Sequence, residues 1–334
     1  MKSKKFDVVV IGSGPGGYVC AIRLAQLGFK TAIIEKYNSL GGTCLNVGCI
    51  PSKSLLDSSH HYDDILNNAK KHGIEINGEV SLDFKKMIDR KNDVVSQTVK
   101  GIDFLMSKNQ ISVFNGKASF LENNLISVDG CDETLSFDKC IIATGSKPVN
   151  LPFINLDKKR IITSTEALSL KEIPKHLIII GGGVIGLELG QVYNRLGSKV
   201  SVIEYSDRIT PFMDKDVSRE LNKVLKKEGI NFYLSHQVFE VKSNEKTVSV
   251  LAKNKKDEVI SFDSDYCLVS VGRKPYTEGL NLEKIGVELD SKGRININDR
   301  FETSIEGIYA IGDVVRGTML AHKAEEEGIA VAEL

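Results

Sequence analysis

The hydrophobic positions near the start of the chain follow the pattern of a strand–helix–strand unit. Phe6–Ile11 is a short, apolar, β-branched run typical of a buried parallel strand, and it leads directly into the glycine-rich segment Gly12–Gly17. Tyr18–Leu27 then has apolar residues at helical spacing, and a second apolar run, Lys30–Ile34, ends at Glu35. The pattern predicts a complete βαβ unit whose helix follows a glycine-rich turn.

The same pattern occurs again in the middle of the chain, where Leu177–Ile180 and Lys199–Ile203 repeat the two strands. The glycines permit a tight turn and close approach of a pyrophosphate to the helix N-terminus, and the acidic residue can accept from a ribose hydroxyl. One G-x-G-x-x-G turn is weak evidence, but two copies favour two dinucleotide sites over a coincidental pair of glycine turns. The positions that match at one constant offset are Gly12 and Gly181, Gly14 and Gly183, Gly17 and Gly186, Gly28 and Gly197, and Glu35 and Glu204.

The regions that follow the two glycine-rich units are also alike. The segment KCIIATGSKP at residues 139–148 is echoed by YCLVSVGRKP at residues 266–275. In the first half, Ser81–Lys108 predicts a long helix whose apolar stripe packs in the core. Alternating apolar segments predict an antiparallel meander in each half: Ile111–Phe114, Ala118–Phe120 and Leu125–Val128, and then Phe232–Leu234, Val238–Val241 and Thr247–Leu251.

These features predict an α/β fold with two Rossmann-like dinucleotide-binding domains, each with an antiparallel β-meander. A chain of 334 residues exceeds what one hydrophobic core usually organises. We place one domain at residues 1–148, an inserted second domain at 149–275, and the return of the chain to the first domain at 276–334. Pro148, Pro152 and Pro275 mark the expected crossings.

Composition limits the classes of partner. Lys plus Arg balances Asp plus Glu at 44 each, so no overall field directs the protein to nucleic acid or anionic lipid. No apolar run approaches the length of a membrane span, and Met1–Lys5 leads into the first strand without a signal-peptide core. Six cysteines are too sparse for a secreted disulfide scaffold. We expect a cytoplasmic protein with no nucleic-acid or membrane partner.

Glu204 bears on which nucleotide the second unit binds. A carboxylate at this position favours an unphosphorylated ribose, because a 2′-phosphate would face it at close range and would require arginine instead. Arg208 follows four residues later and weakens this inference, although it also fits a surface turn beside Asp207. The sequence favours NAD over NADP.

Cys44 and Cys49 lie just after the first unit, in the segment GGTCLNVGCIPSK. Four intervening residues can bring two cysteines into disulfide range if the turn is distorted, and Gly48 and Pro51 suit such a bend. Two thiolates without a further ligand nearby do not complete a metal site, so we expect none. A structural disulfide is disfavoured in a cytosol, which leaves a redox-active pair. The remaining cysteines are expected to be small buried hydrophobes: Cys20, Cys131, Cys140 and Cys267.

Four motifs together resemble the pyridine nucleotide–disulfide oxidoreductases: GSGPGG, GGTCLNVGCIPSK, GGGVIGLELG and the segment GIYAIGDV that contains Asp313. The resemblance covers essentially the whole chain. Within the family, Leu45, Ser52, Ile162–Leu168 and Met319–Gly328 are most similar to the dihydrolipoamide dehydrogenases. Glutathione and mercuric reductases are similar to a lesser degree.

The resemblance implies FAD in the first unit and NAD in the second. It implies that Lys53 lies near the flavin N5 and pairs with Glu188, although a surface lysine and a solvated glutamate are the simpler interpretations. It also implies that Asp313 contacts the ribityl or pyrophosphate region, where a helix cap is the alternative. The implied FAD residues are Gly12, Gly14, Gly17, Glu35, Lys53, Thr144, Gly145, Asp313, Met319, Ala321 and His322, and the implied NAD residues are Gly181, Gly183, Gly186, Glu204 and Gly272.

The catalytic residues implied by the resemblance are Cys44, Cys49, Lys53 and Glu188. A dihydrolipoamide thiolate would attack Cys44, Cys49 would leave as a thiolate beside the flavin, and electrons would pass through FAD to NAD. The partners implied are the lipoyl domains of 2-oxo acid dehydrogenase or glycine cleavage complexes.

The family also uses a histidine–glutamate pair on a C-terminal interface domain of a homodimer. None of the six histidines has the expected sequence context, and the sequence ends at Leu334. We therefore expect a truncated chain that lacks this domain and turns over dihydrolipoamide poorly. The alternatives are another flavin disulfide reductase, similar to glutathione or mercuric reductase, and a non-catalytic fragment that binds FAD and NAD.

Overall fold

The computed structural model describes residues 3–334, and the chain divides into two compact units. The first unit contains the chain up to Asn46, Val95–Lys147 and Arg273–Leu334, and the second contains Val47–Val94 and Pro148–Gly272. Two short strands, β7 (Ser146–Pro148) and β16 (Arg273–Pro275), pair with each other where the chain leaves and re-enters the first unit.

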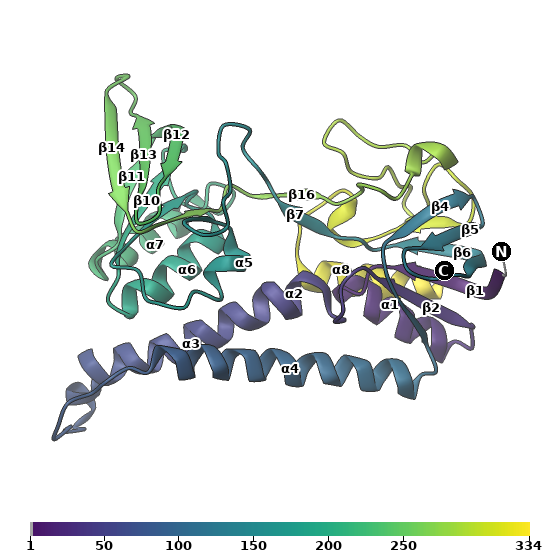
Figure 1. Ribbon diagram of the computed structural model, residues 1–334, viewed down its shortest axis with the longest axis horizontal. Helices are drawn as coiled ribbons and strands as arrows, with labels where there is room; N and C mark the ends of the chain where they lie inside the picture. The colour runs from purple at the N-terminus through teal and green to yellow at the C-terminus, as the bar shows by residue number, and fades with distance from the viewer. Residues whose placement is uncertain (1–2) are drawn as a thin grey trace. The chain divides into compact units, whose positions relative to one another are not determined.

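A seven-stranded sheet forms the centre of the first unit (Figure 1), with the order β3-β2-β1-β6-β5-β4 and with β17 also paired to β6. The pairs β4–β5 and β5–β6 are antiparallel, whereas the other pairs of this sheet are parallel. The strands are β1 (Ser3–Ile11), β2 (Thr31–Glu35), β3 (Ser112–Asn115), β4 (Ala118–Glu122), β5 (Leu125–Val128), β6 (Thr134–Ile142) and β17 (Ile308–Ala310).

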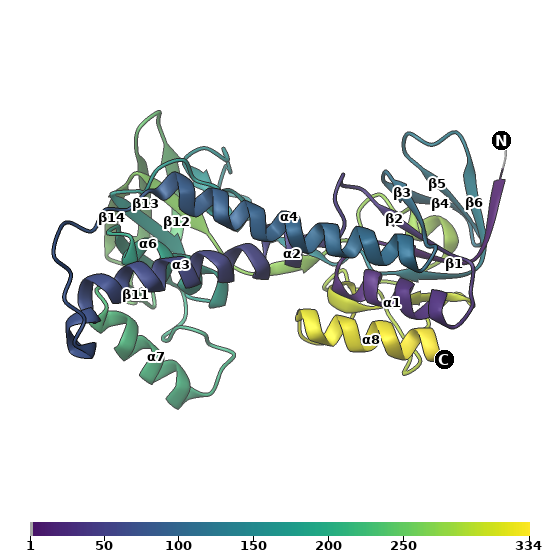
Figure 2. The same ribbon diagram turned by 90° about the horizontal axis from the view of Figure 1, so that it is seen from below.

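Two helices of the first unit, α1 (Pro15–Gln26) and α8 (Ala321–Glu333), lie side by side (Figure 2). Small residues permit this contact, because a Cβ on Gly328 would lie 2.6 Å from the carbonyl oxygen of Gly16. The shorter helices of this unit are η2 (Leu282–Ile285) and η3 (Gly312–Val314), and α2 (Gly42–Val47) ends where the chain passes into the second unit.

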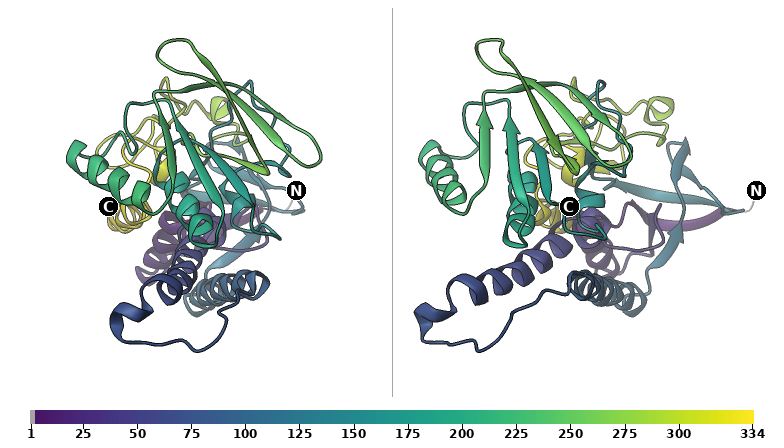
Figure 3. Two further views of the ribbon diagram at one scale, coloured as in Figure 1. Left: turned by 90° about the vertical axis from the view of Figure 1, so that its left-hand side faces the viewer. Right: turned by 60° about the vertical axis from the view of Figure 1, so that its left-hand side comes forward.

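The second unit has a five-stranded parallel sheet with the order β11-β10-β9-β15-β8. A separate antiparallel sheet of β12, β13 and β14 shares a buried core with it (Figure 3). The strands are β8 (Ile161–Ile162), β9 (His176–Ile180), β10 (Lys199–Glu204), β11 (Asn231–Leu234), β12 (Gln237–Ser243), β13 (Val248–Lys253), β14 (Val259–Ser264) and β15 (Tyr266–Val269).

The helices of the second unit pack against the other face of its parallel sheet, around the buried Tyr193 and Leu55. The long helix α4 begins in this unit and continues into the first unit after Val94. The bounds are α3 (Cys49–Asn67), η1 (Ala69–His72), α4 (Phe84–Lys108), α5 (Ser164–Ala167), α6 (Val184–Arg195) and α7 (Lys215–Lys227). None of the helices in residues 3–334 has the length and hydrophobicity needed to cross a membrane.

The two predicted βαβ units and the α/β fold are confirmed, but two strands were predicted with the wrong partners and direction. Ile111–Phe114 was expected in an antiparallel meander, yet β3 runs parallel to β2. Phe232–Leu234 was expected in the second meander, yet β11 runs parallel to β10. Both strands follow a helix, α4 or α7, which returns the chain to the same end of the sheet as a crossover does. The alternation of apolar residues gives no information on strand direction.

The glycine-rich turns of the two units have the same backbone geometry. Gly12 and Gly181 begin the turns with φ angles of 102° and 104°, which favour glycine. A Cβ on Gly17 would lie 1.8 Å from the carbonyl oxygen of Gly12, and a Cβ on Gly186 would lie 2.5 Å from that of Gly181. Each helix therefore packs against its own preceding turn at a distance that excludes a side chain.

Gly17→Ala should destabilise the protein by about 1–3 kcal/mol, because the added methyl group overlaps the backbone of Gly12. The matched control is Gly101→Ala in the exposed part of α4, where an added Cβ meets nothing within 4 Å. This control should stabilise the protein by about 0.5–1 kcal/mol through helix propensity. Thermal unfolding of both variants measures the two effects, and equal melting temperatures would contradict the packing argument.

Lys91 is a buried charge on the first part of α4. Its side chain is 4% exposed, and its Nζ donates to Ser169 Oγ over 3.3 Å. Burial lowers its pKa, because the charged form loses hydration that one hydroxyl does not replace. The folded state is therefore penalised while Lys91 is charged, and the penalty fades as the pH rises through the lowered pKa.

Lys91→Met should raise the melting temperature at pH 7 by roughly 2–4 °C, because it removes this penalty and keeps an apolar side chain of similar length. The gain should shrink as the pH rises through the lowered pKa of Lys91, because the wild-type side chain then becomes neutral too. Lys100→Met, an exposed lysine on the same helix, should change the melting temperature little. A gain that does not vary with pH would refute the electrostatic explanation.

Candidate nucleotide and cysteine sites

In the first unit, Glu35 is buried at the end of β2 and binds the glycine-rich turn. Its Oε2 accepts hydrogen bonds from Ser13 N (3.0 Å) and Ser13 Oγ (2.6 Å), and its Oε1 accepts from Tyr37 N (3.1 Å). Ser13 lies between the first two glycines of the turn. The carboxylate predicted to bind a ribose is thus held at the turn by backbone and hydroxyl donors.

Glu204 has the same environment in the second unit. Its Oε2 accepts from Gly182 N (2.6 Å) and its Oε1 from Ser206 N (2.7 Å), so the acidic residue again binds the amide after the first glycine. Arg208 donates to Pro211 O over 2.9 Å and lies 3.6 Å from Asp207 Oδ1. Its buried Nε has no hydrogen-bond partner among residues 3–334.

The space at each turn suits a pyrophosphate. A Cβ on Gly14 or on Gly183 would meet nothing within 4 Å, so the backbone is open to a ligand at both positions. Each of these residues caps a helix of 12 residues, α1 or α6, whose first amides have no acceptor within the helix. An anion is favoured there by those amides and by the helix dipole.

The residues predicted around the flavin in the first unit come together near η3. Ser146 Oγ donates to Asp313 Oδ2 over 2.5 Å, and the preceding Thr144 and Gly145 both bond to the backbone of Tyr276. The start of α8 adjoins η3, because Lys323 Nζ donates to Gly312 O and Glu327 accepts from Gly312 N. Of the residues predicted in that segment, Met319 and Ala321 are partly buried and His322 is exposed.

The two predicted redox cysteines belong to successive helices. Cys44 lies in α2 and is partly exposed, whereas Cys49 is exposed and begins α3. Gly48, between the two helices, has the irregular angles φ −138° and ψ −120°. The helix is therefore interrupted between the two cysteines, at a glycine that the sequence analysis identified as suited to a bend.

Tyr18, on α1, is a neighbour of Cys44 that the sequence did not indicate. Its hydroxyl donates to Glu325 Oε1 on α8 over 3.3 Å. Burial, then the Glu325 carboxylate, and to a smaller extent the charge of Cys44 raise the pKa of Tyr18 to about 12. Tyr18 therefore stays protonated at neutral pH and directs its one hydrogen to Glu325.

In the second unit, Lys53 and Glu188 form an ion pair, with 2.6 Å between Nζ and Oε1. Ser52 Oγ lies 3.4 Å from the other carboxylate oxygen of Glu188. Glu188 thus lies on the side of α6 that faces α3. The sequence-based pairing of Lys53 with Glu188 is found in the structure.

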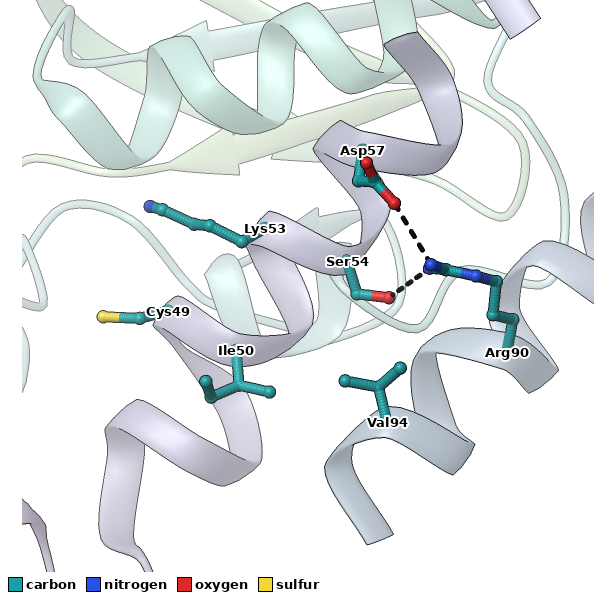
Figure 4. Close-up of a pocket in the computed structure, with 7 residues that line it drawn as sticks. All are labelled: Cys49, Ile50, Lys53, Ser54, Asp57, Arg90 and Val94. Carbon is teal, nitrogen blue, oxygen red and sulfur yellow. Dashed lines mark hydrogen bonds and ion pairs between the residues drawn. The ribbon is translucent and has the colours of Figure 1, made fainter. Parts of the chain in front are cut away.

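An open cavity of about 330 Å³ adjoins Cys49, and Figure 4 shows its lining. The side chains of Cys49 and Lys53 point the same way from α3, and Arg90 of α4 approaches α3 from the other side. Arg90 donates to Ser54 Oγ (3.1 Å), Ser58 Oγ (3.2 Å) and Asp57 Oδ2 (3.1 Å). Arg90 therefore ties α4 to the helix that begins with Cys49.

Three of the remaining four cysteines are buried, which makes their thiols unreactive. Burial raises the pKa of the Cys20, Cys140 and Cys267 thiols, which keeps them protonated. Cys131 was also expected to be buried, but it is only partly buried, because it lies in the turn between β5 and β6 and packs on the edge of the core. Within residues 3–334 no group of three or more His, Cys, Asp or Glu side chains is placed to hold a metal ion.

Four residues with contacts in these regions were missed by the sequence analysis, two of which carry a signal in the sequence and two of which carry none. Ser13 could have been noticed as the one polar residue inside the first glycine turn, and Arg273 as the residue that aligns with Ser146 in the repeated closing segments. Tyr18 and Arg90 carry no sequence signal, because their neighbours come from other helices.

Comparison with known proteins supports this arrangement. Residues 6–328 match the family model described as pyridine nucleotide-disulphide oxidoreductase. The mitochondrial dihydrolipoyl dehydrogenase of Pisum sativum is 47% identical, covering 99% of this chain and 67% of its own length, and the dihydrolipoyl dehydrogenase of Trypanosoma brucei brucei is 46% identical, covering 98% and 70%. The chain thus spans about two-thirds of the length of these relatives.

Among solved structures, the Cu(II) complex of the HOCl-induced flavoprotein disulfide reductase RclA from Escherichia coli superposes with a TM-score of 0.87 at 29% identity, covering 99% of this chain and 70% of that one. The family uses FAD and a pyridine nucleotide. With two matched nucleotide turns, a cysteine pair and a family model that covers nearly all of its length, this chain belongs to the pyridine nucleotide–disulphide oxidoreductases.

Proposed function

We propose that this chain carries the nucleotide sites and the redox-active cysteines of a dihydrolipoyl dehydrogenase, which oxidises protein-bound dihydrolipoamide and reduces NAD. The relatives that bear this name support the assignment. The single observation that carries it is the arrangement on α3, where Cys49 begins the helix and Lys53, one turn later, is bound to Glu188. This arrangement places a fixed cation beside an exposed sulfur.

The first unit would hold FAD and the second NAD. Bound FAD would accept two electrons from the cysteine thiols and deliver them to NAD as hydride. On the FAD side we assign Gly12, Gly14, Gly17, Glu35, Lys53, Thr144, Gly145, Asp313, Met319, Ala321 and His322, and on the NAD side Gly181, Gly183, Gly186, Glu204 and Gly272.

The sulfur chemistry would begin with the Cys44–Cys49 disulfide. A substrate thiolate would bond to the Cys44 sulfur as the Cys44–Cys49 bond breaks, and Cys49 would leave as a thiolate. The second substrate thiolate would then attack the first substrate sulfur and release Cys44. The substrate dithiol is thereby oxidised to a cyclic disulfide, and the cysteine pair takes up its two electrons.

Two features of α3 would stabilise the Cys49 thiolate. Cys49 is the first residue of a 19-residue helix, where the helix dipole and the first amides favour a negatively charged group. Lys53 is its neighbour one helical turn away, and Glu188 limits the directions in which the ammonium group can turn. Cys49 is therefore assigned as the leaving thiolate.

Cys49→Ser should abolish the long-wavelength charge-transfer absorbance that a thiolate beside oxidised flavin produces. The measurement is a visible spectrum of the FAD-loaded chain after one equivalent of dithionite. Cys131→Ser, a change at a partly exposed cysteine away from this helix, is the control and should leave the band unchanged. A band that persists in Cys49→Ser would refute the role assigned to Cys49.

NAD is favoured over NADP because the buried carboxylate of Glu204 would face a 2′-phosphate. A second candidate function is an NADPH-linked flavin disulfide reductase. The buried Nε of Arg208, which has no partner within residues 3–334, favours it, because a phosphate would satisfy this donor. The two candidates differ in their preferred nucleotide.

Glu204→Gln tests this choice, because it removes the charge and keeps one acceptor oxygen for the amide of Gly182 or of Ser206. We expect the wild-type flavin to be reduced faster by NADH than by NADPH, and the preference to fall about tenfold in Glu204→Gln, because removing the negative charge relieves repulsion of the 2′-phosphate. Stopped-flow reduction rates with both nucleotides provide the measurement. A wild type that prefers NADPH would support the second candidate.

The natural partners proposed are lipoyl domains of 2-oxo acid dehydrogenase or glycine cleavage complexes, with a homodimer as the assembly. The proposed location is the cytoplasm, because the chain has few cysteines and a balanced charge. The relative from Pisum sativum is named as mitochondrial.

A further inference from the structure

Three side chains from distant parts of the chain form a continuous series of hydrogen bonds in the first unit. Arg273 Nε donates to Ser146 Oγ over 2.8 Å, and Ser146 Oγ donates to Asp313 Oδ2 over 2.5 Å. A second donor of Arg273, its terminal NH2, bonds to the carbonyl oxygen of Ser146 over 2.7 Å. The guanidinium group therefore holds both the side chain and the backbone of Ser146.

The chemistry of the two end groups fixes the direction of this series. A guanidinium group can only donate and an ionised carboxylate can only accept, so the hydroxyl between them must direct its single hydrogen to Asp313. Ser146 is 9% exposed, which limits competition from water. Bonds to charged groups are stronger than neutral ones and polarise each other. One oxygen of Asp313 is thus engaged, which restricts the orientations open to its carboxylate.

The contact between Ser146 and Arg273 runs diagonally across two paired strands. Both residues occupy the same position in the repeated closing segments, GSKP and GRKP, and each begins one of the paired strands β7 and β16. The strands run antiparallel, because Val149 N donates to Gly272 O and Tyr276 N donates to Gly145 O, so Arg273 lies opposite Pro148 and its long side chain reaches along the pair to Ser146. The two bonds to one serine require the planar fork of arginine, which lysine cannot reproduce.

We propose that Arg273 is a positioning residue for the flavin: through Ser146 it orients the Asp313 carboxylate, which keeps its other oxygen to accept from a hydroxyl of FAD. The proposal rests on the proposed function, in which the first unit binds FAD. Arg273 would act on FAD through Ser146 and Asp313. Thr144 and Gly145, which directly precede Ser146, are bonded to Tyr276 and hold the serine backbone in place.

The test measures the dissociation constant of FAD for the apoprotein of the full chain, by quenching of flavin fluorescence. Ser146→Ala and Arg273→Lys should each weaken binding about tenfold, because each breaks a hydrogen bond to a charged group. Arg273→Lys keeps the positive charge but cannot make both hydrogen bonds to Ser146 at once. The double variant should bind no more weakly than either single variant, since both act through the same carboxylate.

Asp313→Asn provides a second, nearly isosteric route to the same site, and adding Ser146→Ala to it should have little further effect. Lys147→Met is the matched control, because this cation lies next to Ser146 on β7 but pairs with Glu278. It should change FAD binding less than twofold. Thermal unfolding of each apoprotein identifies variants that fail to fold.

A spectroscopic readout separates orientation from general stability. The visible circular dichroism of bound flavin should change in the same way in Ser146→Ala, Arg273→Lys and Asp313→Asn, and should stay at the wild-type form in Lys147→Met. Full recovery of binding in Arg273→Lys, or additive losses in the double variant, would overturn the positioning role alone. A wild-type chain that binds no FAD would overturn the proposed function and this proposal with it.

Discussion

The closeness of a helix to the turn before it is the constraint on which both nucleotide units depend. In each unit the space for a Cβ at the third glycine, Gly17 or Gly186, is taken by the carbonyl group of the first. The helix can therefore begin directly at the turn, with its first amides directed into the open space beside Gly14 or Gly183. The acidic residue at the end of the next strand binds the same turn. Backbone packing thus leaves helix amides open toward a space that suits an anion.

Helix α3 likewise brings two groups together, because it carries both the Cys49 thiol and the Lys53 ammonium group. An exposed thiol at the start of a helix differs in reactivity from the buried thiols of Cys20, Cys140 and Cys267, whose pKa values burial raises. Glu188 connects α3 to α6, which begins at the second glycine turn. The orientation of Lys53 is thereby linked to the helix that would bind the nicotinamide dinucleotide.

Much of this fold could be predicted from the sequence because its main signals are local and repeated. Apolar runs, glycine positions and a terminal acid identify each βαβ unit, and the repeat distinguishes them from chance. Strand direction could not be predicted for β3 and β11, since periodicity does not report it. The contacts of Tyr18 with Glu325 and of Arg90 with Asp57 join different helices, and only tertiary packing brings such residues together. The pairing of Lys53 with Glu188 was predicted through family resemblance, which carries tertiary information that spacing lacks.

The two closing segments show how a repeat can supply unlike residues to one contact. Strands β7 and β16 pair antiparallel, because Val149 N donates to Gly272 O and Tyr276 N donates to Gly145 O, so among the repeated positions only Lys147 and Lys274 face each other. These two lysines share the Glu278 carboxylate as their counterion. Arg273 instead reaches Ser146 along the pair of strands, and there serine supplies an acceptor while arginine supplies two donors and a charge. Because the two copies differ at this position, one segment supplies the cation and the other supplies the hydroxyl that lies between it and a proposed cofactor site.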